Sequence, residues 1–292
     1  MMEVIRHWTV VLVGLTLTGL VCAAALPLAI SPRGGTAPSI FLAESPVRAT
    51  AAVLAAGAVA FIVAVVVGRL INAAVGLFVM GWGLAVFAMR TDTVREVILS
   101  GEAGLWLIAA ETLFWAAVAL ALTMLMFRLA GPLKDIHPRE FEAPPHPLWS
   151  ADALKCAAAG VLVIPVVLLL ARSPMKGQVL TAAFFGAVAA GLVGRLLAPH
   201  VQPVLLFATP CAAGALGHLA GRFMLGQQSL ESAFIAHELP PLCLPMPMDY
   251  AGASLMGVAF GLGWARTFLH HEDEAAEPTA KGAMPHPAPG DG

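Results

Sequence analysis

Ionisable side chains are scarce within the apolar stretches of this sequence, so each one found there needs a physical reason. Glu111 is the single carboxylate in the run LWLIAAETLFWAAV at 105–118. An ionisable group inside a membrane span costs about 2.5–3.5 kcal/mol on insertion scales and is therefore a functional candidate. Further polar residues lie at the ends of later apolar runs, and together they predict one polar pocket in the outer half of the membrane. Its predicted members are Glu111, Lys176, Gln178, His218, Arg222 and Asp249.

A plainer interpretation gives Glu111 a structural role. A carboxylate in a helix bundle can pair with a cation and hold two helices together, and Lys176, Arg172 and Arg90 are the available partners. A shifted span boundary that leaves Glu111 in the membrane interface is the third alternative. A lone buried histidine such as His218 is likewise more often a hydrogen-bonded core residue than a ligand.

Small and basic residues carry two further predictions. Gly217 with Gly221, and Gly257 with Gly261, have the GxxxG spacing that lets two membrane helices approach closely. We expect these pairs to pack helices of the same chain, and a face for a partner protein is the alternative. Arg69 and Arg195 each stand at a tight turn between apolar runs, where extension to lipid phosphates explains both.

The elements that must position these residues are transmembrane helices. The 292 residues are 59% hydrophobic and only 12% charged, with a mean hydropathy of +0.84, whereas soluble domains carry about 25% charged residues. The apolar residues come in runs of roughly 20, the length at which a helix crosses the hydrocarbon core. We expect an all-α bundle of about eight spans in two four-helix halves. The predicted spans are 8–30, 50–68, 71–89, 105–127, 154–171, 178–198, 201–223 and 250–269.

The predicted halves are joined by a linker rich in proline. Pro132, Pro138 and Pro144 exclude a continuous helix through it. The expected organisation is an N-terminal membrane half, the linker, a C-terminal membrane half with an external loop of extended backbone, and a disordered tail. These parts cover 1–130, 131–153, 154–271 with its loop at 224–249, and 272–292.

Basic residues near the ends of the predicted helices set the expected orientation. Four of them fall in the segment 128–155, which places this segment and both termini in the cytoplasm and the protein in the inner membrane. Arg6, followed by an apolar core and the small residues at 22–25, leaves a cleaved signal peptide as the alternative for the first span.

Several function classes find no support in the sequence. It contains no nucleotide-binding loop, metalloprotease, serine-hydrolase or haem motif, and its four cysteines have no metal-ligand spacing, so neither a metal nor a cofactor is expected. A formal net charge of -2 disfavours nucleic acid as a partner. We expect a non-catalytic structural or accessory subunit of a membrane assembly, in contact with lipid and with membrane partners or further copies of itself. A permease or channel with an outward-facing pocket, and an intramembrane enzyme acting on lipid, are the alternatives.

Overall fold

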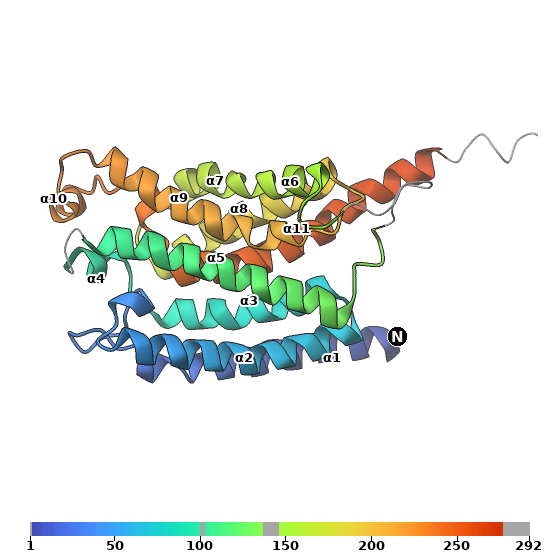
Figure 1. Ribbon diagram of the computed structural model, residues 1–292, viewed down its shortest axis with the longest axis horizontal. Coiled ribbons are helices and arrows are strands. Elements are labelled where there is room, and N and C mark those ends of the chain that lie inside the picture. Colours follow the sequence, from blue (N-terminus) through green and yellow to red (C-terminus); the bar gives the residue numbers. More distant parts are fainter. Residues whose placement is uncertain (1, 100–102, 137–145, 277–292) are drawn as a thin grey trace, which may run out of the picture.

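The computed structural model describes residues 2–99, 103–136 and 146–276, which form a bundle of roughly parallel and antiparallel helices (Figure 1). The long helices of the first part of the chain are α1 (Met2–Ala23), α2 (Pro46–Leu70), α3 (Ala73–Arg90) and α5 (Ala103–Ala130). Those that follow are α6 (Ala151–Ala158), α7 (Val163–Leu170), α8 (Lys176–Leu197), α9 (Thr209–Met224) and α11 (Pro247–Ala276). The short helices α4 (Val94–Leu99) and α10 (Leu230–Ile235) lie at the end of the bundle opposite the N-terminus. Five short 3-10 turns, η1 to η5, complete the helical elements of the described residues.

Six helical segments are long and apolar enough to cross a membrane, as expected of an integral membrane protein. They are Val4–Leu28, Pro46–Leu70, Ala73–Arg90, Gly104–Ala130, Ala151–Leu170 and Lys176–Leu197. The fifth combines α6 and α7, which the 3-10 turn η3 (Ala159–Leu162) joins into one rod. The expected count of about eight is not confirmed, and neither are two halves. The remaining predicted spans correspond to α9, which has 16 residues, and to α11, which does not reach the same apolarity.

The position of α11 explains its lower apolarity. It packs along both α8 and α3, and every residue from Pro247 to Val258 is buried. Its glycines permit this close approach. A Cβ on Gly252 would lie 2.8 Å from the backbone nitrogen of Ala85 in α3, and one on Gly257 would lie 2.6 Å from the Phe184 carbonyl oxygen in α8. A helix enclosed by other helices does not need the hydropathy of one that faces lipid.

Local signals define where the helices begin and end. Asn72 caps α3 because its Oδ1 accepts a hydrogen bond from the Val75 backbone nitrogen (2.9 Å), and Ser150 caps α6 in the same way through Ala153 (3.1 Å). Gly131 follows α5 with φ +89°, a left-handed conformation that glycine adopts easily, and so turns the chain out of the helix.

Three parts of the predicted organisation can be compared with the structure. The 224–249 segment is not simply extended, because α10 and the 3-10 turn η5 (Pro241–Cys243) lie within it and Leu242, Cys243 and Leu244 are buried. Ser229 caps α10 by accepting a hydrogen bond from the Ser232 backbone nitrogen, and Pro241 begins η5, which explains the difference. α11 continues to Ala276, so the first residues of the predicted tail are helical, whereas 277–292 lie outside the described residues. Residues 137–145 of the predicted linker also lie outside the described residues.

Candidate functional site

Lys176 and Asp249, two of the six residues expected to form an outer pocket, meet in the structure. Lys176 Nζ lies 3.2 Å from Asp249 Oδ2, and the two side chains are 10% and 0% exposed. The same Asp249 oxygen accepts a hydrogen bond from the Met246 backbone nitrogen (2.7 Å). Because Lys176 begins α8 and Asp249 lies in the first turn of α11, the pair fastens the starts of these two helices to one another.

Glu111 is fully buried in α5, as expected of a residue within a span, but three of its four donors come from a loop that the sequence did not single out, and the fourth is Trp115 of α5. Its Oε1 accepts from the Ile40 backbone nitrogen (3.2 Å) and from Trp115 Nε1 (3.2 Å). Its Oε2 accepts from the Phe41 backbone nitrogen (3.0 Å) and from Ser39 Oγ. In the part of the chain that the structure describes, no ion pair joins Glu111 to a cation, so the expected pairing with Lys176, Arg172 or Arg90 is not seen.

These four donors give Glu111 a structural role. It holds the 3-10 turn η2 (Ile40–Leu42), in the connection between α1 and α2, against α5. Buried polar groups require such partners because an unmade hydrogen bond leaves the cost of desolvation without compensation. Two of these donors are backbone N–H groups, which every residue except proline has. The residue types in the loop therefore could not predict them.

Two other members of the predicted pocket, Gln178 and Arg222, are also held by local partners. Gln178 accepts a hydrogen bond from Ser173 Oγ and donates to the Leu170 carbonyl (3.1 Å), which closes the turn between α7 and α8. Arg222 donates to the Gly226 carbonyl (3.0 Å). The buried ring of His218 packs edge-on against Tyr250, with 5.5 Å between the ring centroids. Neither ring nitrogen makes a hydrogen bond within the described residues, so the expected hydrogen-bonded histidine is not seen. These contacts do not gather the six residues around one described cavity, and a shared role for them stays a prediction.

The glycine pairs lie at contacts within the chain. A Cβ on Gly261 would meet the Val188 carbonyl of α8, and Gly257 faces the same helix. A Cβ on Gly221 would meet the sulfur of Cys243, while Gly217 has only ordinary contacts with Leu242 and Tyr250. The Cys243 thiol that Gly221 accommodates is buried, and burial raises its pKa to about 12, so it remains protonated at neutral pH.

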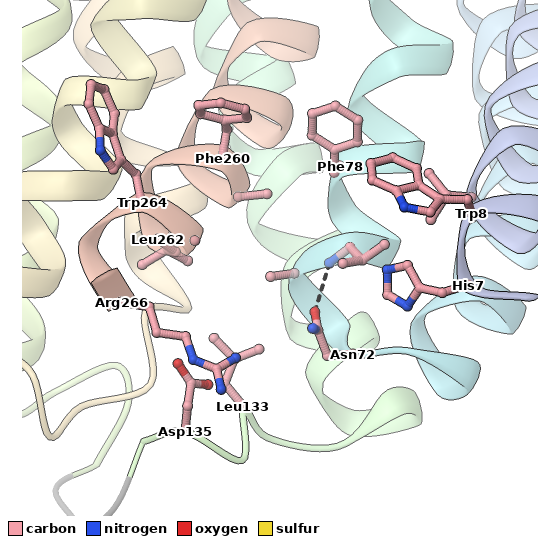
Figure 2. A pocket seen from close by; sticks show the side chains of 15 residues that line it. His7, Trp8, Asn72, Phe78, Leu133, Asp135, Phe260, Leu262, Trp264 and Arg266 are labelled. Carbon is pink, nitrogen blue, oxygen red and sulfur yellow. Dashed lines mark hydrogen bonds between the residues drawn. The ribbon is translucent and has the colours of Figure 1, made fainter. Parts of the chain in front are cut away.

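One large cavity lies at the end of the bundle that carries the N-terminus. It has a volume of about 680 Å³ and is bounded by α1, the start of α3, the segment after α5 and the second half of α11 (Figure 2). We call it the groove. Its lining residues are His7, Trp8, Val11, Asn72, Ala74, Val75, Phe78, Leu133, Asp135, Ala259, Phe260, Leu262, Gly263, Trp264 and Arg266.

The groove has an apolar part and a polar end. Trp8, Phe78, Phe260 and Trp264 line the apolar part, and Figure 2 shows Trp8 and Phe78 facing Phe260 across it. The side chains of Trp8, Phe260 and Trp264 are 60%, 53% and 50% exposed, so the rim of the groove belongs to the outer surface of the bundle. Gly263 opens it further, because a Cβ at this position would meet nothing within 4 Å.

A second cavity, of about 570 Å³, continues from the polar end of the groove. We call it the basin. Asn72, Asp135 and Arg266 line both cavities. The basin is lined by Gly68, Arg69, Ile71, Asn72, Ala130, Pro132, Lys134, Asp135, Arg195, Arg266 and Leu269. Four of these side chains are basic and one is a carboxylate, so the wall of the basin carries an excess of positive charge.

Two basic residues of the basin are those that the sequence placed at tight turns. Arg69 is exposed, and its Nε donates to the Leu129 carbonyl at the end of α5 (2.8 Å). Arg195 is only 5% exposed, which does not fit its expected extension to the surrounding lipid. Its Nη1 donates to the Pro199 carbonyl (2.6 Å) and its Nη2 to the Asp135 carbonyl (3.1 Å). Arg195 therefore holds the segment after α5 in place.

The segment after α5 is also held by the side-chain amide of Gln202. Gln202 accepts a hydrogen bond from the Leu133 backbone nitrogen (3.0 Å) and donates one to the Leu133 carbonyl (3.2 Å). An ion pair of 3.7 Å between Arg195 Nη2 and Asp135 Oδ2 adds to this attachment. The fixed segment places Lys134 and Asp135 on the basin wall. Sequence reasoning missed Lys134, Arg266 and the aromatic rim as a site, because residues from distant parts of the chain form it and no spacing signals their approach.

Comparison with family models, curated proteins and solved structures found no match for this chain. No group of three or more histidine, cysteine, aspartate or glutamate side chains is placed to hold a metal ion within the described residues. The four cysteines are free and buried.

Proposed function

We propose that this integral membrane protein binds a membrane amphiphile, with the hydrocarbon part of the ligand in the groove between α1 and α11. The observation that carries the proposal is the combination of an aromatic, apolar cavity whose rim belongs to the outer surface with a polar cavity at its end. Because the molecule is a membrane protein, its outer surface along the long helices faces lipid. A ligand can therefore enter sideways from the bilayer.

The dimensions of the groove support this proposal. Small-molecule sites in proteins have volumes of about 300–1,000 Å³ and are lined mainly by apolar and aromatic side chains with a few polar groups. The groove, at about 680 Å³, falls within this range and has the same kind of lining. α3 forms its floor, since it packs against both α1 and α11.

This function is compatible with the non-catalytic accessory role expected from the sequence, in which a bound lipid would help the protein associate with membrane partners. The permease alternative depended on an outer pocket that contains Glu111, Lys176 and His218. Glu111 and Lys176 are engaged in contacts that fasten a loop and two helices, whereas the buried nitrogens of His218 make no hydrogen bond within the described residues. The lipid-modifying enzyme depended on Glu111, His218 and Asp249 acting together, and Glu111 and Asp249 have separate partners.

We also propose that α9 and α11 cross the membrane, which together with the six apolar segments gives eight crossings. The 16 residues of α9 span about 24 Å, close to the ~30 Å hydrocarbon core, and α11 is sheltered by α3 and α8. In Figure 1 both run along the axis of the other long helices. The N-terminus, the segment after α5 and the C-terminal end of α11 then lie on one face of the membrane, for which we keep the predicted cytoplasmic assignment.

A photo-reactive lipid tests the binding function. The full chain, purified in mild detergent, is labelled with a diacylglycerol that carries a diazirine on one acyl chain, and the labelled peptides are mapped. We expect saturable labelling on the α1 and α11 residues that line the groove. Gly263→Leu fills the groove and should lower that labelling about tenfold, because overpacking a site costs about 1–3 kcal/mol.

The matched control is Gly177→Leu near the start of α8, since a Cβ on Gly177 also meets nothing within 4 Å and lies outside the groove. This variant should keep full labelling. Labelling that spreads evenly over lipid-facing helices, or that survives Gly263→Leu unchanged, contradicts the proposal.

A further inference from the structure

We infer that residues 240–246, which include the 3-10 turn η5, form an acid-released cover over His218. Protonation of His218 detaches the cover from α9 while the rest of the bundle stays folded. The inference is independent of ligand binding in the groove, because the groove lining and the cover share no residue.

The contact between α9 and α11 contains polar atoms that the fold leaves without partners. Three buried side-chain nitrogen or oxygen atoms make no hydrogen bond within the described residues, and they are both ring nitrogens of His218 and the Oγ of Ser254. Ser254 lies one turn after Tyr250, the residue that packs against His218, so it belongs to the same side of α11. A buried polar group without a partner costs about 1–3 kcal/mol and requires an explanation.

Packing alone does not explain a histidine at position 218. The ring is 1% exposed and meets Tyr250 edge-on, a contact that phenylalanine makes equally well. The Leu242 backbone lies near enough to act electrostatically on the ring, but not in the geometry of a hydrogen bond. What distinguishes histidine from phenylalanine here is its ability to take up a proton between pH 5 and 8.

The cover encloses His218 by side-chain packing against α9. A Cβ on Gly221 would meet the sulfur of Cys243, and one on Gly217 would lie 3.6 Å from a methyl carbon of Leu242. The turn η5 therefore rests on α9 on both sides of His218. Almost every residue of the cover is buried, so this segment separates the ring from water.

The backbone of the cover does not depend on α9. Its hydrogen bonds close within the turn, from the Cys243 nitrogen to the Pro240 carbonyl (2.9 Å) and from the Leu244 nitrogen to the Pro241 carbonyl (3.2 Å). The Met246 nitrogen donates to Asp249 (2.7 Å), which attaches the end of the cover to α11. The cover can therefore leave α9 as a local opening without breaking these bonds.

No neighbouring anion is available to a protonated His218. The titratable and charged groups toward this end of the bundle, on α9 and on the elements packed against it, are Glu111 of α5, Lys176 of α8, Cys211 and Arg222 of α9, Cys243 of η5, and Asp249 and Tyr250 of α11. Glu111 already accepts from four donors, and Asp249 is paired with Lys176. Within the described residues, no ion pair joins His218 to a carboxylate.

The direction of the pH effect follows from where the proton can reside. A histidine in water takes up a proton at about pH 6.5, whereas a buried imidazolium without an anion is strongly disfavoured. The closed state therefore holds His218 neutral, and the open state gains the proton. The closed cover is stable above about pH 6.5 and loses stability as the pH falls below that value.

Thiol reactivity of the full chain in mild detergent tests the inference. The reagent is 4,4′-dithiodipyridine, which reacts with thiols in weak acid as well as at neutral pH, and the modified peptides are identified by mass spectrometry. Each rate is divided by that of free cysteine at the same pH. We expect labelling of Cys243 to rise about thirtyfold between about pH 7.5 and about pH 5, because one proton is taken up on opening. The buried thiols of Cys22 and Cys156 lie outside the cover and should stay unreactive.

Replacement of His218 locates the effect. His218→Phe keeps a ring against Tyr250, and His218→Gln replaces it by a smaller side chain, so one of the two serves if the other does not fold. Neither side chain takes up a proton, and labelling of Cys243 should not rise in acid. The control is His237→Asn, because His237 is exposed, precedes the cover and has φ +59°, a conformation that asparagine also adopts. This control should keep the full rise.

The possible results decide the inference. A rise confined to Cys243 that disappears in the His218 variants and persists in His237→Asn supports it. The absence of a rise, an equal rise in the His218 variants, or a rise that includes Cys22 and Cys156 overturns it. None of these results changes the labelling of the groove, so the proposed function is tested separately.

Discussion

The two ends of the bundle treat polar side chains differently. At the end that carries α4 and α10, Glu111 accepts hydrogen bonds from four donors and Asp249 is paired with Lys176. At the end that carries the N-terminus, basic side chains surround two connected cavities in which they outnumber the carboxylate. Polar groups that are buried in contact with one another fasten the fold, whereas those at the second end line a space that a ligand could enter.

The comparison teaches that the depth of a charge in a membrane protein does not by itself indicate function. Glu111 is the most deeply placed acid of the apolar runs, and it is also the most completely satisfied one described above. Lys134 and Arg266 are exposed, yet they belong to the site that we propose to be functional. Substitutions at the first end should therefore change stability, and substitutions at the second end should change binding.

The largest loss of stability is expected from Glu111→Ala. The variant leaves the buried donors of Ile40 and Trp115 and the half-buried donor of Phe41 without an acceptor, at a cost of about 1–2 kcal/mol each, so the free energy of unfolding should fall by about 3–6 kcal/mol. Unfolding in detergent, measured against denaturant concentration, checks this value. A loss below about 1 kcal/mol would mean that the loop between α1 and α2 does not depend on this carboxylate.

The next largest effect is expected at the buried ion pair. Lys176→Met leaves Asp249 buried without its cation and should lower the free energy of unfolding by about 3–5 kcal/mol. The double variant Lys176→Met/Asp249→Asn should recover part of this loss, because no uncompensated charge remains. A double variant no more stable than the single one would show that the Met246 hydrogen bond to Asp249, rather than the ion pair, dominates.

The smallest effects are expected from two glycines of α11 that lie two positions apart. Gly261→Ala places a Cβ against the Val188 carbonyl and should destabilise the protein by about 1–3 kcal/mol. Gly263→Ala adds a Cβ to open space in the groove and should be neutral or stabilising by up to about 1 kcal/mol. The difference between their unfolding temperatures measures how sharply α11 divides a packed face from an open one. Equal temperatures would contradict that division.

The sequence predicted the helices much better than the site. The expected spans 50–68, 71–89 and 178–198 correspond to α2, α3 and α8, because long apolar runs bounded by proline, asparagine or basic residues determine where a membrane helix can lie. The sequence also marked Arg69 and Arg195, from their places at the ends of helices. It could not show that Lys134 and Arg266 join them, since that depends on how the helices pack.

The predicted seventh and eighth spans, which correspond to α9 and α11, show that hydropathy alone does not identify every long helix of the bundle. α11 is less apolar than the six candidate spans because its surface is covered by α3 and α8, and hydropathy measures suitability for lipid rather than for a protein interior. The partners of Glu111 were missed for a related reason. Two of its donors are backbone nitrogens, which residue type does not reveal.

The central place of α11 has a consequence for how the protein is made. α3 and α8 leave the ribosome before α11 does, yet much of their glycine- and alanine-rich surface finds its partner only in that later helix. α3 and α8 therefore lack this packing partner until α11 has been synthesised. The contacts of α11 with α3 and α8 can form only after α11 has been synthesised, so they complete the bundle last.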